Sequence, residues 1–335
     1  MRDRFYFIAE IGVNHDGSLE KAKNLVDLAK EAGADCVKFQ TYKTDLVVSK
    51  KAPKAAYQKI VTDKNESQYD MLARLEFRYD WFPEIIEYCK KQEIDFLTTP
   101  NNFEDIDFLV DLGLNEFKVA SYQSTELPYL EYIAKKSKRI YLSLGMTTTS
   151  EAIKAIEVAS DYCEVIPLQC TTNYPSLLEH SNIGFVKTLK SLFPKVGYSC
   201  HVNSNIPSIV AASYGATVFE KHFTYSKTAQ GPDHSSSYVK EDVQRLISEL
   251  SDVYCSIGSH LRVPFEIELT NQNGMKRSLF TKGDLKKGHV LTRENIEFKR
   301  PLTGGIKIND LELVVGRTLG SDLSDDTQLQ WKDLC

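Results

Sequence analysis

Short apolar runs alternate with longer amphipathic stretches through most of this chain. The runs are typical of buried strands, and they are Phe5–Ile11, Asp35–Gln40, Ile94–Thr98, Glu116–Val119, Arg139–Ser143, Glu164–Leu168, Lys195–Tyr198 and Thr217–Glu220. Helical periodicity fills the gaps, for example over 81–91 and 103–112, and Thr148 and Glu151 have the spacing of a capping box. Strand and helix alternating eight times predict an α/β fold, a (β/α)8 TIM barrel.

The main alternative fold is a doubly wound open sheet. The turn after the first strand, residues 11–17, lacks the Gly-x-Gly-x-x-Gly fingerprint of a dinucleotide site, which favours the barrel. The segment Tyr42 to Glu66 is longer than most strand-to-helix loops and rich in lysine. In a barrel it would lie on the active-site face, so we expect it either to cover the substrate or to be a solvated surface loop.

A second, smaller domain is predicted after the barrel. The barrel is expected to occupy residues 1–258, and 259–275 lose clear periodicity and are predicted to be a linker. Short strands broken by glycine turns then indicate a small α+β module at 276–335. A module of this size is marginally stable alone, so it should pack against another domain or subunit.

Composition excludes several classes of protein. The chain has 335 residues, 42% of them hydrophobic and 26% charged, with a formal net charge of −5, and shows no basic patch for nucleic acid. The seven cysteines are odd in number, scattered and without a Cys-x-x-Cys pair, which favours reduced thiols and a cytoplasmic location. We expect no signal peptide and no membrane span.

Two histidines follow the last two predicted strands. His201 and His222 occupy equivalent strand ends, which indicates a two-histidine metal site. Neutral imidazoles suit Mn, Zn or Fe, and two protein ligands would leave positions open for water and a substrate oxygen. The alternative is that both are hydrogen-bonded core histidines.

Polar residues at the carboxyl ends of the strands should face the catalytic mouth of a barrel. Besides the histidines, those positions include Glu10, Lys38, Gln40, Thr99, Lys118, Ser121, Gln123, Ser143, Tyr174, Ser199 and Glu220. Lysines together with hydroxyl groups suit the oxygens of a phosphate, although a single strand-end lysine is more often a solvated surface residue. A metal beside a phosphate site predicts carbon–carbon bond formation between an aldehyde and an enol phosphate.

Other chemistries remain open at this point. A class II aldolase fits the same residues, and so does a Schiff-base aldolase using Lys118 or Lys38, although the latter leaves the histidines unexplained. A metal-dependent hydrolase usually needs more ligands than the sequence offers. A binding module without catalysis is the alternative from a different class.

Ordered motifs along the whole chain are similar to those of the bacterial sialic acid synthase family, which includes N-acetylneuraminate, legionaminic acid and pseudaminic acid synthases. The motifs are 8–17 (IAEIGVNHDG), 37–40 (VKFQ), 66–68 (ESQ), 99–100 (TP), 117–121 (FKVAS), 142–146 (LSLGM), 170–175 (CTTNYP), 197–201 (GYSCH), 220–224 (EKHFT) and 231–234 (GPDH). The tail resembles the antifreeze-like SAF domain of the same family.

The resemblance implies condensation of phosphoenolpyruvate with the open-chain aldehyde of an N-acylated amino sugar, either N-acetylmannosamine or 2,4-diacetamido-2,4,6-trideoxymannose. It implies a divalent metal held by His201 and His222, typically Mn²⁺, with Mg²⁺, Co²⁺ or Zn²⁺ as alternatives. Glu10 is implied to support a metal-bound water or proton transfer, and Gln123 and Glu220 complete the candidate catalytic groups. The implied phosphoenolpyruvate ligands are Lys38, Thr99, Lys118, Ser121, Ser143 and Ser199. The implied sugar ligands are Gln40, Tyr174, Asp233 and Arg300.

Arg300 matches an arginine that, in the family, reaches the active site of the other protomer of a domain-swapped homodimer. Without the family, a surface salt bridge would explain it. The chain departs from the family at Gln123, where members commonly have a carboxylate, and at Cys200, where the family has aspartate. Glutamine cannot exchange a proton as a carboxylate does, and Cys200 removes a possible acceptor beside the metal site. These departures leave room for a pseudaminate-type or other divergent sugar.

Overall fold

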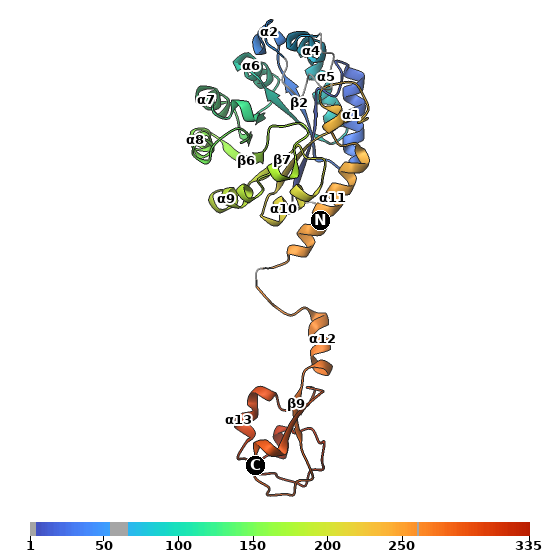
Figure 1. Ribbon diagram of the computed structural model, residues 1–335, viewed down its shortest axis with the longest axis vertical. Coiled ribbons are helices and arrows are strands. Elements are labelled where there is room, and N and C mark those ends of the chain that lie inside the picture. Colours follow the sequence, from blue (N-terminus) through green and yellow to red (C-terminus); the bar gives the residue numbers. More distant parts are fainter. Residues whose placement is uncertain (1–4, 54–65, 260) are drawn as a thin grey trace. The chain divides into compact units, whose positions relative to one another are not determined.

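The computed structural model describes residues 5–53, 66–259 and 261–335. Within these ranges the chain divides into two compact units, 1–258 and 259–335. Figure 1 shows the first unit as strands surrounded by helices, and each unit is described by itself below.

The first unit is a parallel eight-stranded barrel, which confirms the predicted fold class. Its strands follow the order β3-β2-β1-β8-β7-β6-β5-β4, and contacts between β3 and β4 bring the two ends of this order together into a nearly closed barrel. The strands are β1 (Tyr6–Gly12), β2 (Cys36–Thr41), β3 (Asp95–Pro100), β4 (Glu116–Val119), β5 (Arg139–Ser143), β6 (Glu164–Cys170), β7 (Gly197–Cys200) and β8 (Val218–His222). All eight predicted strands are present.

Helices cover the outside of the barrel. They are α1 (Leu19–Ala32), α2 (Thr44–Val47), α4 (Gln68–Leu75), α5 (Phe82–Lys91), α6 (Phe103–Asp111), α7 (Leu127–Lys135), α8 (Thr149–Ser160), α9 (Gly184–Leu192), α10 (Ile206–Ser213) and α11 (Lys240–Ile257). The predicted capping box is confirmed, because the Thr148 hydroxyl accepts from Glu151 N while the Glu151 carboxylate accepts from Thr148 N. Capping of this kind satisfies amide groups that the first helical turn leaves unpaired.

The alternation of side chains along each strand positions the site. In β1, Phe7 and Ala9 belong to the large core between strands and helices, whereas Ile8 belongs to a separate apolar cluster that lies among the strands. Because side chains alternate along a strand, Glu10 faces the same way as Ile8. The interior is therefore apolar toward the amino ends of the strands and polar toward their carboxyl ends.

The long insertion after β2 is only partly described. Its beginning forms α2, where the backbone N–H and the hydroxyl of Thr44 both donate to Glu76, each over 2.8 Å. Residues 54–65 lie outside the described ranges, so the expected substrate-covering role of 42–66 stays a prediction. None of the helices in the described ranges is both long and apolar enough to cross a membrane.

The second unit contains a two-stranded antiparallel sheet of β9 (Ser278–Thr281) and β10 (Ile296–Lys299), with the short helix α13 (Leu311–Val314). Its own core includes Leu279, Leu291 and Leu329. The stretch expected to be a linker contains α12 (Glu266–Met275), none of whose residues is buried. Because α12 has no buried face, its sequence has no apolar stripe from which a helix could have been predicted.

Candidate active site

A cavity of about 180 Å³ opens at the carboxyl ends of the barrel strands, and every strand contributes to its lining. All but two of the predicted site residues line it, namely Glu10, Lys38, Gln40, Thr99, Lys118, Ser121, Ser143, Tyr174, Ser199, His201, Glu220, His222 and Asp233. Side chains alternate in direction along a strand, and each of these residues lies on the inward face near the end of its strand or in the loop that follows.

Two lysines enter the cavity, each beside a glutamate. Lys38 Nζ lies 2.6 Å from Glu10 Oε2 and donates to Thr99 Oγ1 over 3.2 Å. The second lysine, Lys118, lies 3.9 Å from Glu220 Oε2. It also donates to the Ser143 hydroxyl over 2.6 Å. All these side chains are buried, so their charges interact through a medium that screens them weakly.

The two glutamates differ in how readily they hold a proton. Burial raises the pKa of Glu10 to about 7, with Glu220 adding to the rise and Lys38 opposing it. Burial acts on Glu220 in the same direction, but Lys118, Lys38 and a hydrogen bond from Ser199 outweigh it and lower its pKa to about 2. At neutral pH, of these two glutamates, Glu10 can therefore exchange a proton and Glu220 stays ionised.

Several buried polar atoms in this cavity have no hydrogen-bond partner within the described ranges. They are Glu10 Oε2, Glu220 Oε2 and His222 Nδ1. Of these three atoms, Glu10 Oε2 is in ion-pair contact with Lys38 Nζ, 2.6 Å away. Buried polar groups are nearly always paired in folded proteins, so unpaired atoms in a cavity indicate where a ligand binds.

The two histidines lie next to each other, with their ring centroids 5.4 Å apart. His201 Nδ1 lies 2.7 Å from the carbonyl oxygen of Thr171, which can only accept, so this nitrogen carries a proton and Nε2 is the nitrogen that could bind a metal. Burial acts to lower the pKa of His201, but Cys170 and the bond to Thr171 outweigh burial and raise that pKa above its usual value. Burial and the neighbouring His201 hold the pKa of His222 well below its usual range, which keeps that imidazole neutral. Neutral imidazoles with available lone pairs fit a metal such as Mn or Zn.

Within the described part of the chain, groups of three or more His, Cys, Asp or Glu side chains with metal-binding geometry are absent. An ion here would therefore depend on the two imidazoles and on oxygen atoms from water or substrate. Asp233 is the nearest further carboxylate, with Oδ2 3.7 Å from His222 Nδ1, and burial raises its pKa to about 6. Tyr174 lies over the pair, its ring centroid 4.1 Å from that of His201.

Gln123 is not brought to the cavity. It is completely buried, and its amide nitrogen donates to Pro100 O over 3.1 Å and to Asn101 O over 3.3 Å. Its amide oxygen accepts from Ala120 N. Because these bonds hold both ends of the side chain against backbone, Gln123 has a structural position in the fold, and its catalytic role stays a prediction.

Arg300 and Cys200 also differ from the other predicted residues. Arg300 lies in the second unit with an exposed side chain, and its contact with a substrate stays a prediction. Cys200 was expected to remove a possible acceptor beside the metal site. Its thiol accepts from Lys221, because Cys200 alternates with Ser199 and His201 and faces the outside of the barrel.

Sequence reasoning missed one wall of the cavity. Met71, Leu72 and Leu75 of α4 line it, together with Asn101 and Tyr122. Ser67 caps α4 by accepting from Asp70 N, and apolar residues at 71, 72 and 75 have helical spacing. These two signals could have identified α4 as a helix with a buried face, but not the cavity that this face adjoins.

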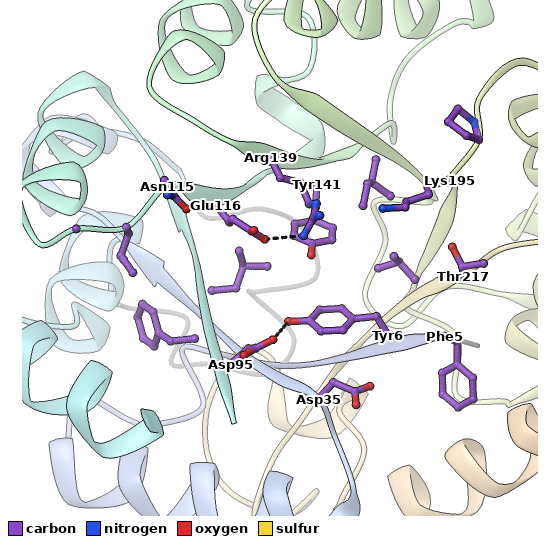
Figure 2. A pocket seen from close by; sticks show the side chains of 17 residues that line it. Phe5, Tyr6, Asp35, Asp95, Asn115, Glu116, Arg139, Tyr141, Lys195 and Thr217 are labelled. Atoms are coloured by element: carbon purple, nitrogen blue, oxygen red, sulfur yellow. Dashed lines mark hydrogen bonds and ion pairs between the residues drawn. The ribbon is translucent and has the colours of Figure 1, made fainter. Parts of the chain in front are cut away.

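A larger cavity, of about 700 Å³, lies at the amino end of the barrel. Figure 2 shows two contacts among its polar groups: Tyr6 donates to Asp95 over 2.7 Å, and Arg139 donates to Glu116 over 3.0 Å. No histidine is among its lining residues in the described ranges. The chemistry of a barrel enzyme resides at the carboxyl ends of the strands, so the smaller cavity is the candidate active site.

Comparison with known proteins identifies the family of the chain. Residues 25–262 match the NeuB family and residues 276–334 match the SAF domain. The chain is 38% identical to N,N'-diacetyllegionaminic acid synthase of Campylobacter jejuni, covering 95% of this chain and 97% of the relative, and 28% identical to a pseudaminic acid synthase of the same species, covering 98% and 96%. The crystal structure of N-acetylneuraminic acid synthetase from Leptospira borgpetersenii, in complex with citrate, superposes with a TM-score of 0.71 at 26% identity, covering 81% of this chain and 90% of that one. The chain therefore belongs to the NeuB family of phosphoenolpyruvate-dependent acid synthases, and its C-terminal region is a SAF domain.

Proposed function

We propose that this enzyme condenses phosphoenolpyruvate with the open-chain aldehyde of an N-acylated amino sugar, giving a nonulosonic acid and inorganic phosphate. The observation that carries the proposal is one cavity in which two lysine–glutamate pairs adjoin a histidine pair with available nitrogen atoms. A Schiff-base aldolase would need one lysine but would leave the histidine pair without a role.

The lysines and hydroxyl groups are suited to phosphoenolpyruvate. Lys38 and Lys118 would hold its phosphate and carboxylate as point charges, and Thr99, Ser121, Ser143 and Ser199 would supply short donors. In the free enzyme Lys38 and Lys118 interact with Glu10 and Glu220. The bound anion would therefore compete with the two glutamates for the lysines, and a proton on Glu10 would relieve the repulsion.

His201 and His222 would hold a divalent metal, with Mn²⁺ the first choice. When bound, the metal would act as a Lewis acid that polarises the sugar aldehyde for attack by C3 of phosphoenolpyruvate. Glu10, with a pKa of about 7, is suited to give or take a proton as the aldehyde oxygen becomes a hydroxyl. Water then adds to C2, and loss of phosphate from the resulting tetrahedral carbon leaves the ketone.

For the sugar, we propose 2,4-diacetamido-2,4,6-trideoxymannose first, because the identity to the legionaminic acid synthase is higher than to the pseudaminic acid synthase. N-acetylmannosamine and a pseudaminate-type or otherwise divergent sugar are the alternatives. Gln40, Tyr174 and Asp233, which line the cavity around the histidines, are the proposed sugar contacts.

We also propose a domain-swapped homodimer in which Arg300 completes the partner's site. Apolar side chains around α12 support this, since Leu261, Phe265 and Ile267 are 77%, 72% and 68% exposed within a single chain. Exposed apolar groups of this extent mark contact surfaces. Light scattering of the full chain tests the dimer, and Arg300→Ala should raise KM for the sugar without changing KM for phosphoenolpyruvate.

The experiment that tests the function measures phosphate release from phosphoenolpyruvate across a panel of N-acylated hexosamines, with Mn²⁺ and after EDTA. Metal-dependent release with one sugar would establish the reaction and identify the product. Metal-independent turnover, together with covalent trapping by borohydride, would favour the Schiff-base alternative. Silence across the panel would contradict the proposed substrate class.

A further inference from the structure

Lys221 is a buried lysine with no carboxylate in contact among the described residues. It lies in β8 between Glu220 and His222, whose side chains face the cavity, so its own side chain points to the outside of the strand layer. Only 2% of it is exposed. Burying an amine is costly unless it is hydrogen-bonded, so its contacts need an explanation.

Those contacts flank His201 on both sides. Lys221 Nζ donates to the thiol of Cys200 over 3.1 Å and to the carbonyl oxygen of Val202, the residues immediately before and after His201. The ring of Tyr238 covers the same amine, with its centroid 4.1 Å from Nζ. Tyr238 in turn donates its backbone N–H to His222 O over 2.8 Å. One amine thus contacts the segments that carry both histidines.

The contact with Val202 lies where the sheet no longer joins the two strands. The register of β7 with β8 ends at the pair Cys200 and Lys221, so His201 comes one residue after the last ladder pair. His222, by contrast, remains inside β8. The backbone ladder therefore does not fix the separation of the two imidazoles, whereas the Lys221 side chain extends the connection beyond the end of the ladder.

We propose that Lys221 is a positioning residue for the two-histidine site, with the Cys200 thiol and the Val202 carbonyl as its anchors on the other strand. The inference rests on the proposed metal-binding role of His201 and His222. Metal–nitrogen bonds tolerate displacements of only about 0.2 Å, and loss of an outer partner of a metal ligand typically weakens metal binding about 10–100-fold.

The departure from the family at position 200 acquires a role in this arrangement. Cys200 does not reach into the cavity as an acceptor for His201; it is the acceptor for Lys221. A merely structural role for Lys221, stabilising the barrel wall, is the competing explanation. The two explanations predict different results for a variant that lacks the amine: a positioning role predicts weaker metal binding, whereas a role confined to the barrel wall predicts a lower Tm alone.

The test uses Lys221→Met in the full-length chain, because methionine keeps the unbranched shape and removes the amine. Val202 O would retain the Cys200 thiol as a donor, at 3.7 Å in the present structure, so the backbone is not left unpaired. The matched control is Lys227→Met. Lys227 lies 5.6 Å from the same Tyr238 ring and is ion-paired with Asp242, but it is half exposed.

The readout is the dissociation constant for Mn²⁺ alone, measured by the electron paramagnetic resonance signal of free Mn²⁺ without substrates, alongside Tm. We expect Lys221→Met to bind Mn²⁺ at least tenfold more weakly with Tm changed by only a few degrees, and Lys227→Met to stay within twofold of the wild type. If Lys221→Met does not fold, Cys200→Ala decides, because it removes one anchor while keeping the amine; it should weaken Mn²⁺ binding several-fold.

Wild-type affinity for Mn²⁺ in a folded Lys221→Met variant would overturn the inference and leave the proposed function intact. If Lys221→Met does not fold, wild-type affinity for Mn²⁺ in Cys200→Ala would do the same. Failure of the wild-type chain to bind Mn²⁺ would overturn both the inference and the metal role proposed for the histidines. A fall in Tm without a change in Mn²⁺ affinity would assign Lys221 to the barrel wall alone.

Discussion

Replacing Gln123 with glutamate should destabilise this enzyme rather than accelerate it. The family resemblance places a carboxylate at this position, so the substitution looks like a repair. In the structure, however, the amide nitrogen of Gln123 donates to Pro100 O and Asn101 O in a completely buried setting. A carboxylate oxygen there would face two carbonyl oxygens and could donate to neither of them.

The magnitude follows from the lost bonds and the buried charge. Two carbonyl oxygens would each lose a donor at about 1 kcal/mol net, and the carboxylate would either be buried ionised or take up a proton. Taking up a proton at pH 7.5, about three units above the unfolded pKa, costs at most about 4 kcal/mol at 1.36 kcal/mol per unit, and returns one O–H donor. We therefore expect a loss of about 1–5 kcal/mol at pH 7.5, which corresponds to a fall in Tm of roughly 2–20 °C.

The loss should depend on pH with a defined sign. A glutamate whose folded pKa lies above its unfolded value is favoured in its protonated form, so the variant should be closest to wild type below about pH 4.3 and lose stability as the pH rises toward the folded pKa. Thermal unfolding followed by circular dichroism at pH 5 and pH 7.5 measures this. The control is Gln244→Glu, since Gln244 is exposed and makes one similar bond to Glu31 O. A Gln123→Glu variant with wild-type Tm at both pH values, or with faster phosphate release, would contradict this reasoning.

Three further outcomes are expected. Gly145→Ala should raise KM for phosphoenolpyruvate about tenfold or more in steady-state assays, because an added Cβ would lie 2.7 Å from Ser121 Oγ and 2.5 Å from Thr172 Oγ1. The control Gly184→Ala should match wild type, because a Cβ at residue 184 would meet open space. Asp16→Asn should raise KM for the sugar while sparing KM for phosphoenolpyruvate: Asp16 accepts from His234 and Tyr225 and so holds the loop that carries Asp233. Burial acts to raise the pKa of Asp16, but hydrogen bonds from His234, Lys21 and Tyr225 outweigh burial and lower that pKa. The contribution of Asp16 to stability should therefore be present above pH about 4 and lost in acid. A pH titration of Tm in which Asp16→Asn shows the same acid loss as wild type would contradict this. Chelation with EDTA should abolish phosphate release and Mn²⁺ should restore it, while His222→Ala should not be rescued by Mn²⁺ at concentrations that saturate wild type; full activity after exhaustive chelation would exclude the metal role.

The fold and most of the cavity could be predicted from the sequence because both depend on short-range periodicity. Eight apolar runs separated by helical patterns are sufficient for a barrel. Inward-facing polar residues near the carboxyl ends of the strands then meet, because all eight strands end on the same side of the barrel. Lys38, Lys118, His201 and Glu220 were found in this way, and all four line the cavity. The helix α12 could not be predicted, since a helix without a buried face has no periodic pattern.

What the sequence could not determine is the direction of side chains next to the site. Gln123 and Cys200 stand one residue from cavity positions, and only the tertiary structure shows that one bonds to the Pro100 carbonyl and the other to the Lys221 amine. Strand alternation is a local rule, whereas the partner that satisfies a buried polar group comes from another strand far along the chain. The sequence by itself thus determined which strand-end residues line the cavity, and only the packing of distant segments against one another decided which partners their neighbours bond to.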